Sequence, residues 1–369
     1  MTTMSLGRRS RVLMLLALCA CGGGGTPAPH AGPRRQMLQD VTATVIVPGY
    51  EALATAAADQ VAALRALEAQ PDAAALAAAQ TAWRRARSAW KQSEPFAFGP
   101  AATLRTAAKI DWSPLRADRL ERAIAVAAAF DSAAIEDLGA NVKGFLALEY
   151  LLFDPTGDDD AVLAALRAAP QRRAYARALA ENLRDQAGQL RDAWSPTGGN
   201  FAAEFATAGQ GSATYPTVKT AVDALVNQLV FLSDDVAQRQ LLAPLGSELA
   251  PRPDLIAAAR SGSGLVDVLD AVAGIQNAYF GAYTGQRGAS LSRVVQGISP
   301  PVDTAIELSA ERVLAAAADL SVPLEDALVS QRPAVARLQA RAADLMRRLE
   351  VDLISVLGTT LRFNPGDGD

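Results

Sequence analysis

The chain has 369 residues, and 50% of them are hydrophobic, so it is long enough and apolar enough to bury a sizeable core. Its formal net charge at pH 7 is only −4, which argues against sequence-independent binding of nucleic acid, because such binding requires a basic surface. The single histidine, His30, lies in a glycine- and proline-rich stretch, so mechanisms that need a positioned imidazole lose their usual base or ligand. Alanine is abundant and aromatic residues make up only 5%, a balance that favours helices and predicts an all-α protein.

The N-terminus resembles an export signal. Residues 1–20 place arginines before a short apolar run and small residues after it, which is the order found in a signal peptide. Leu18-Cys19-Ala20-Cys21 resembles a bacterial lipobox, and Cys21 is the better lipid acceptor because the small Ala20 precedes it. We therefore expect an exported cell-envelope protein, anchored by lipid on Cys21 to the outer membrane and facing the periplasm, with a flexible linker at residues 21–40. An ordinary secretion signal with incidental cysteines is the alternative.

From about Val45 onward the apolar residues recur at helical spacing. One stripe alternates steps of three and four and so lies on a single helix face. It consists of Leu76, Ala79, Trp83, Ala86 and Trp90. No segment alternates polar and apolar residues for long enough to predict a strand. The predicted helices fall at about residues 53–64, 76–90, 120–153, 179–194, 218–236, 254–279, 301–320 and 333–357.

Prolines separate these predicted helices, and short antiparallel helices pack best as bundles. A Gly/Ser-rich stretch at residues 195–214 is the clearest break in composition, so we expect two antiparallel helical bundles in tandem, at residues 41–195 and 215–369. Gly144 and Gly274 lie in similar short segments of the two halves. Glycine inside a helix is less favourable than alanine by about 1 kcal/mol, so this pair suggests that helices approach closely at both places.

Several short motifs follow one another from about residue 41 to 369. The central one is Gly144-Phe-Leu-Ala-Leu-Glu149-Tyr. The others are Val47–Tyr50, Trp83–Pro100, Lys109–Pro114, Leu241–Gly246, Ala259–Gly262 and Leu361–Asp369. In this order they resemble the imelysin family, whose G-x-H-x-x-E-Y motif aligns with the central segment. The resemblance implies a two-bundle helical fold with a site between the bundles. It also links the chain to a family named for peptidase activity and associated with bacterial iron acquisition and with envelope lipoproteins.

The motif carries one departure from the family pattern. In typical members a histidine and a glutamate three residues apart share one helix face and can approach a single metal ion. Here Leu146 occupies the histidine position and has no lone pair to donate, so the metal-binding role does not carry over to that residue. Glu149 remains, and a carboxylate in such apolar surroundings must be paired, hydrogen-bonded or protonated.

Three interpretations of Glu149 stay open. In the first, it keeps a ligand- or metal-binding role together with carboxylates such as Glu94 and Asp111, a donor set suited to an iron or calcium ion. In the second, it forms a structural ion pair with Arg260, because Arg260-Ser261 also resembles a family motif. In the third, it faces solvent.

The function predicted from these residues is a binding module with a degenerate metal site. Such a module captures a metal ion, a metal complex or another small ligand at the membrane surface, in iron or metal acquisition. A peptidase is the weaker alternative, because there is no H-E-x-x-H motif and no cysteine nucleophile in the folded region. A scaffold that binds another envelope protein in the groove between the bundles is the third possibility.

Overall fold

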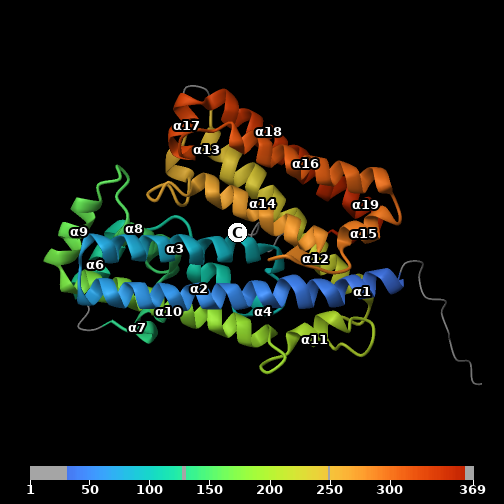
Figure 1. Cartoon of the computed structure of the whole chain (residues 1–369), viewed down its shortest axis with the longest axis horizontal. Coiled ribbons are helices and arrows are strands. Elements are labelled where there is room, and N and C mark those ends of the chain that lie inside the picture. Colours follow the sequence, from blue (N-terminus) through green and yellow to red (C-terminus); the bar gives the residue numbers. More distant parts are fainter. Residues whose placement is uncertain (1–30, 127–129, 248–249, 362–369) are drawn as a thin grey trace, which may run out of the picture.

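The computed structural model describes residues 31–126, 130–247 and 250–361 (Figure 1). Within these residues the chain is helical apart from one short antiparallel strand pair, β1 (Ala282–Tyr283) and β2 (Gln286–Arg287). The predicted all-α class is therefore confirmed. The predicted signal peptide and the lipidation site Cys21 lie outside the described residues.

The α-helices of the described residues are α1 (Ala31–Val41), α2 (Val47–Ala69), α3 (Ala73–Ser93), α4 (Pro100–Thr103), α5 (Thr106–Ile110), α6 (Ala117–Val126), α7 (Ser132–Glu136), α8 (Gly144–Leu152), α9 (Asp159–Ala168), α10 (Pro170–Trp194), α11 (Phe201–Ala206), α12 (Val218–Asp234), α13 (Ala243–Leu245), α14 (Gly264–Phe280), α15 (Leu291–Gln296), α16 (Pro300–Ala318), α17 (Leu324–Ser330), α18 (Arg332–Arg347) and α19 (Ile354–Leu357). Short 3-10 helices are η2 (Glu94–Phe96), η3 (Ala140–Val142) and η5 (Pro253–Leu255). Segments of π-helix are η1 (Thr42–Ile46), η4 (Asp235–Leu242) and η6 (Arg348–Leu353).

In the first group of helices, α2 packs between α3 and α10, and α8 contacts both α3 and α10 (Figure 1). Helix α3 begins after Asp72, whose side chain accepts a hydrogen bond from the backbone N–H of Ala75. The predicted apolar stripe of α3 is buried, as expected. Its Trp83 packs edge-on against Phe145 and donates its ring N–H to the backbone oxygen of Phe145 at 3.0 Å. This contact fixes the position of α8, which carries the motif, relative to α3.

In the second group, α16 packs along α18, while α12 contacts both α14 and α18 (Figure 1). Helix α12 begins with a capping box, in which the side chains of Thr217 and Thr220 each bond to the other's backbone N–H. Between the two groups, the Gly/Ser-rich stretch at 195–214 contains α11, and its Phe205 packs fully buried against Trp194. This stretch is therefore part of the packed structure, and the predicted division into two bundles at this point stays a prediction.

The two groups meet where α14 lies against α3, and their buried apolar residues form one continuous core. The expected close approach at the two glycines is confirmed. A Cβ on Gly274 would lie 2.7 Å from the backbone oxygen of Gln92 in α3, and one on Gly144 would collide with the backbone of Ile110. Glycine is therefore required at both places for the backbones to come this close.

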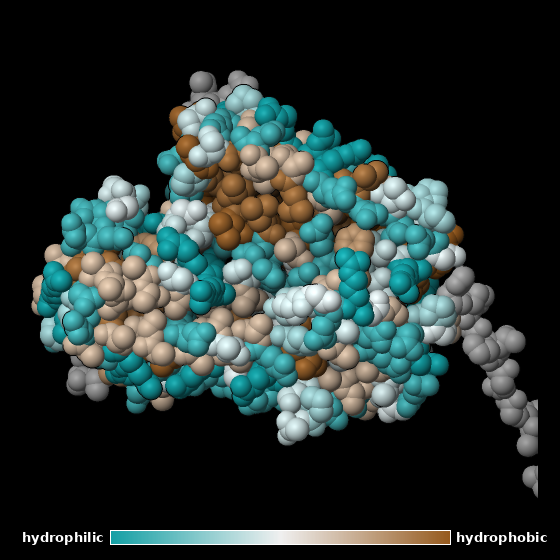
Figure 2. All heavy atoms as spheres, in the orientation of Figure 1, coloured by the Kyte–Doolittle hydropathy of each residue, from teal (hydrophilic) through white to brown (hydrophobic). Residues whose placement is uncertain are grey.

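Helix α14 departs from the usual amphipathic pattern at a few positions, although most of its buried residues are apolar. Its acidic residues Asp267 and Asp270 are buried, whereas Val266 is 50% exposed. Figure 2 shows hydrophobic residues gathered on the outer surface over α14. A helix that turns its carboxylates inward requires buried cations or hydrogen-bond donors to meet them, and α3 provides both at the junction.

The linker predicted at residues 21–40 is too long. Helix α1 begins at Ala31 and continues through η1 and α2 as one helical run to Ala69. Met37 and Leu38 are fully buried, so apolar packing holds this segment in the fold. The run is long and apolar enough to cross a membrane by length and composition, but its buried side chains make it a core helix of the described structure.

Candidate functional site at the junction of the helix groups

The motif helix α8 begins at Gly144, which has a φ of +79° and leaves no space for a Cβ against Ile110. Leu146, in the histidine position, is only 3% exposed. It nevertheless lies outside the continuous apolar core that the other large buried apolar side chains of the described chain form. One turn later, Glu149 is 2% exposed. The third interpretation, in which Glu149 faces solvent, is therefore wrong.

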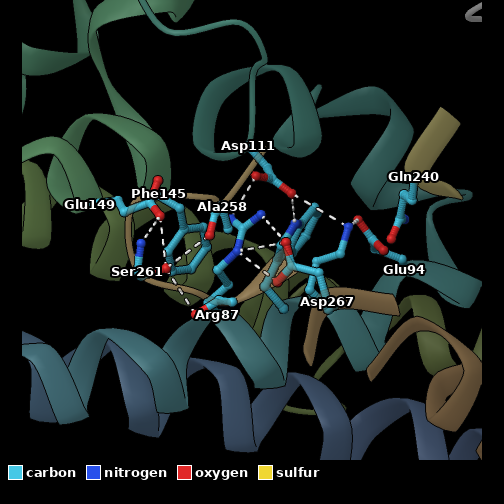
Figure 3. A network of polar contacts seen from close by, with 12 residues as sticks. Arg87, Glu94, Asp111, Phe145, Glu149, Gln240, Ala258, Ser261 and Asp267 are labelled. Carbon is cyan, nitrogen blue, oxygen red and sulfur yellow. Dashed lines mark hydrogen bonds and ion pairs between the residues drawn. The ribbon is translucent and has the colours of Figure 1, made fainter. Parts of the chain in front are cut away.

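A loop of the second group binds Glu149 (Figure 3). Its Oε1 accepts a hydrogen bond from the backbone N–H of Ser261 at 2.8 Å and another from the Ser261 hydroxyl at 2.7 Å. The Ser261 Oγ also lies 2.9 Å from the Oγ of Ser263, which holds the serine in place. Burial raises the pKa of Glu149 to about 7, although the Ser261 hydrogen bonds and the charge of Arg87 act in the opposite direction. Glu149 is thus a buried carboxyl group close to its titration point at neutral pH.

The predicted ion pair between Glu149 and Arg260 is not the arrangement found. Arg260 donates its Nε–H to the backbone oxygen of Phe153 at 3.2 Å, and its guanidinium lies 4.8 Å from the ring centroid of Tyr150. The partner of Glu149 is the neighbouring Ser261. Two neutral donors on a short loop reach the carboxylate directly, and the longer arginine side chain is directed to the end of α8.

A second part of the site is built around Arg87, whose side chain is only 3% exposed (Figure 3). Its guanidinium bonds both oxygens of Asp267 in α14, with the shortest distance 2.6 Å, and one oxygen of Asp111 at 2.9 Å. Burial would lower the pKa of Arg87, but the two carboxylates outweigh it and raise the pKa above its usual value. This ion pair joins α3 to α14 across the junction.

Lys91 continues this network one turn further along α3. Its Nζ lies 2.6 Å from Oε1 of Glu94 and 3.8 Å from Oδ2 of Asp111, which also accepts a hydrogen bond from the Trp90 ring N–H at 3.0 Å. Burial would raise the pKa of Asp111, but Arg87 and Lys91 outweigh it and hold that pKa below its usual value. Burial raises the pKa of Glu94 to about 7 against the attraction of Lys91.

The structure thus brings together most of the predicted site residues, but not as ligands of one metal ion. Glu94 and Asp111 face the cations of α3, and Glu149 is bound separately by Ser261. Within the described ranges, no group of three His, Cys, Asp or Glu side chains lies close enough to hold a metal ion. With Leu146 in the histidine position, these residues do not fit the metal site that the family resemblance implies.

Sequence analysis did not single out Arg87, Lys91 or Asp267. A signal for the first two was present, because Arg87 is four residues after Trp83 and Lys91 is four after Arg87. That spacing continues the side of α3 that faces the core. A charged residue at a core position indicates a buried network, but the partner Asp267 lies 180 positions away in sequence. Spacing along one helix cannot identify a partner at that distance.

The fold and the site define an all-helical protein with a buried charge network at the junction of its two helix groups. A family model described as imelysin, of the peptidase M75 class, matches residues 46–351. The chain belongs to the imelysin family. It is 30% identical over 314 residues to iron-regulated protein A of Synechococcus elongatus, with 84% of this chain and 82% of that protein covered.

Two solved structures share the fold. One is an iron-regulated protein A precursor from Parabacteroides distasonis, with a TM-score of 0.77, 21% identity, and 90% of this chain and 97% of that chain covered. The other is an imelysin-like protein from Psychrobacter arcticum, with a TM-score of 0.73, 16% identity, and coverage of 90% and 98%. At these identities the similarity establishes the helical fold.

Proposed function

We propose that this protein is an exported, lipid-anchored binding module of the cell envelope that acts in iron acquisition. It takes its ligand at the junction of the two helix groups. The observation that carries this proposal is the contact of Glu149 with Ser261, which joins a titratable buried carboxyl group of one group to a loop of the other. The relationship to a protein named iron-regulated protein A supports the connection with iron.

In this proposal the metal site is degenerate, so iron does not bind as a bare ion at the motif helix. Leu146 provides no ligand, and the carboxylates nearest to the motif are bonded to Arg87, Lys91 and Ser261. Displacing those partners would leave buried charges unpaired, which is unfavourable. The ligand is therefore a small molecule or an iron complex that binds without displacing these partners of the carboxylates.

Calorimetric titration of the purified protein tests this function. Iron(III), iron(II), zinc, copper and calcium ions are compared with iron(III) citrate, using the native protein and a Leu146→His variant. We expect the native protein to bind the iron complex, and the variant to gain affinity for zinc or copper. Tight stoichiometric zinc or copper binding by the native protein would contradict the degenerate site. A failure to bind any iron species would contradict the function.

Anchoring at the envelope is tested separately by fractionation of cells that express the native chain or a Cys21→Ser variant. We expect the native protein in the outer-membrane fraction and the variant outside it. Equal distribution of the two would show that Cys21 is not the anchor. A Cys19→Ser variant is the matched control, since it changes the neighbouring thiol and leaves the proposed acceptor intact.

One observation favours a second function, a peptidase. The Ser261 hydroxyl lies 2.7 Å from Oε1 of Glu149, and a carboxylate with a pKa of about 7 is suited to general-base chemistry near neutral pH. In this alternative Ser261 is the nucleophile and Glu149 the base. Purified protein would then cleave an unfolded polypeptide, and Ser261→Ala would abolish the cleavage. Absence of cleavage by the native protein excludes this function.

A further inference from the structure

Two arginines, Arg84 and Arg260, lie at the loop that binds Glu149, and each contacts Phe153. The guanidinium carbon of Arg84 lies 4.6 Å from the Phe153 ring centroid, and its Nη2 donates to the backbone oxygen of Ser261 at 3.4 Å. Arg260 donates from Nε to the backbone oxygen of Phe153 and stacks on Tyr150. Aromatic faces and backbone carbonyls therefore hold both guanidinium groups next to the residue that binds Glu149.

Neither arginine forms an ion pair with a carboxylate of the described chain, whereas a third arginine on the same aromatic surface does. Arg172 also lies over the Tyr150 ring, at 5.4 Å, but its Nη1 bonds both oxygens of Glu121 at 2.7 and 2.9 Å. Arg84 and Arg260 thus keep several N–H donors that no described side chain binds directly, and both arginines contact Phe153.

Two acidic residues near this pair bond elsewhere. Asp159 attracts Arg84 electrostatically, but its Oδ1 accepts a hydrogen bond from Gln80 at 2.7 Å. The carboxylate of Asp154 accepts bonds from the backbone and hydroxyl of Thr156. Burial lowers the pKa of Arg84, and the attraction of Asp159 and Glu149 partly offsets this effect. These carboxylates therefore lower the positive electrostatic potential at Arg84 and Arg260, but they accept no hydrogen bond from the two guanidinium groups.

We propose that Arg84 and Arg260 form a binding site for a ligand with several carboxylate groups. This inference rests on the proposed binding function and names the chemical class of its ligand. A guanidinium group offers parallel N–H donors that match the two oxygens of a carboxylate, and stacking on an aromatic ring fixes its orientation in advance. Because Asp111 and Asp267 are bonded to Arg87 and Glu149 is bound by Ser261, Arg84 and Arg260 are left to offer hydrogen-bond donors to a ligand, and an iron ion binds there chelated by such an anion.

Calorimetric titration of the full-length protein with citrate alone, and then with iron(III) citrate, tests this site. Arg84→Gln and Arg260→Gln are compared with Arg85→Gln. Arg85 is the matched control, since it is exposed, lies next to Arg84 in α3 and forms no ion pair within the described ranges. We expect each site variant to lose affinity for citrate about tenfold or more, because a charge-assisted hydrogen bond is removed, while the control keeps native affinity. Thermal melting shows that each variant is folded.

Two further arms sharpen the test. Inorganic phosphate is titrated beside citrate, and we expect it to bind more weakly, because it has a single anionic group whereas a tricarboxylate has three that can each bind a guanidinium group. Citrate affinity should also fall as salt increases, as expected for charge-based binding. Phosphate binding equal to citrate binding, or an affinity that salt leaves unchanged, would overturn the assignment to a polycarboxylate.

The outcomes separate this inference from the proposed function. Iron binding that is equal in the native protein and in both site variants would overturn the arginine site while leaving iron binding as the function. Citrate binding that is lost in Arg84→Gln and Arg260→Gln, but kept in Arg85→Gln, would support the site even if no iron species adds to the affinity. No measurable citrate binding by the native protein would overturn the inference.

Discussion

Asp111 and Glu149 are buried carboxyl groups of the same site, but the protein holds them in different ways. Asp111 accepts hydrogen bonds from Arg87 and from Trp90 and lies 3.8 Å from the Lys91 ammonium. Glu149 receives only the neutral N–H and O–H donors of Ser261. Cations keep the pKa of Asp111 below its usual value, whereas burial brings that of Glu149 to about 7.

This difference separates a structural end of the site from a responsive end. At the Asp111 end, the carboxylates of Asp111 and Asp267 are bonded to Arg87, and the network joins α3 to α14. At the Glu149 end, the carboxyl group can gain or lose a proton near neutral pH, and Arg84 and Arg260 lie beside the loop that binds it. Ligand binding is therefore expected at the Glu149 end, and loss of folding stability is expected from changes at the Asp111 end.

The largest expected effect comes from removing Arg87, the cation that the carboxylates of Asp111 and Asp267 share. Arg87→Met leaves Asp111 and Asp267 buried without their partner, which should lower the free energy of unfolding by about 3–5 kcal/mol. Urea denaturation at pH 7 measures the change. The control is Arg85→Met on the exposed side of the same helix, for which we expect a change within about 0.5 kcal/mol. Equal effects of the two variants would show that the network does not stabilise the junction.

The second-largest expected effect is a pH dependence of the free energy of unfolding that comes from Glu149. The pKa of Glu149 in the folded protein is about 7, which is higher than its usual value of 4.5. Between these two pH values the native state therefore holds a proton that the unfolded state has released. The free energy of unfolding should therefore fall as pH rises from about 4.5 to 7, by at most about 3 kcal/mol. Glu149→Gln removes this contribution. Glu94 titrates in both the native protein and the Glu149→Gln variant, so the difference between their stability curves isolates the contribution of Glu149. Parallel curves would contradict the assignment of the raised pKa to Glu149.

Much of the fold followed from the sequence, because helices that bury one face must place apolar residues at helical spacing. The stripe from Leu76 to Trp90 shows this directly, since all its members are buried in α3. The start of α1 was missed because residues 31–36 are mostly polar or small, and only Met37, Leu38 and Val41 of this helix carry the apolar signal. Three buried side chains near the end of the helix are too few to show where it begins.

The candidate site was only partly predictable. Glu149 and Ser261 were found because each lies in a motif, but their direct contact was not, since it depends on how a loop of the second group reaches α8. Arg260 was predicted as the ion-pair partner because Arg260-Ser261 also resembles a family motif. In the structure a shorter neighbour with two donors reaches the carboxylate first, and aromatic stacking takes the arginine elsewhere.

A smaller effect is expected from truncation at the responsive end. Glu149→Ala leaves the backbone N–H of Ser261 without its acceptor, whereas the hydroxyl still has Ala258 and Ser263 within hydrogen-bond distance, and an unsatisfied buried donor costs about 1–3 kcal/mol. Glu149→Gln keeps an acceptor oxygen for Ser261, so at pH 7 it should be the milder substitution. Thermal unfolding of the two variants side by side makes this comparison. If alanine destabilises the protein no more than glutamine does, the hydrogen bonds to Ser261 do not hold the loop.

The smallest effect is expected for Arg260→Gln. If Arg260 were the buried ion-pair partner of Glu149, its removal would leave a buried charge unpaired and destabilise the protein by about 3–5 kcal/mol. In the arrangement found, the substitution removes one hydrogen bond to Phe153 and one cation–π contact with Tyr150 at a half-buried position, so we expect about 1 kcal/mol or less. Urea denaturation distinguishes the two values. A small loss of stability combined with a large loss of citrate affinity would place Arg260 among the ligand-binding residues, whereas a loss as large as that of Arg87→Met would return it to the structural network.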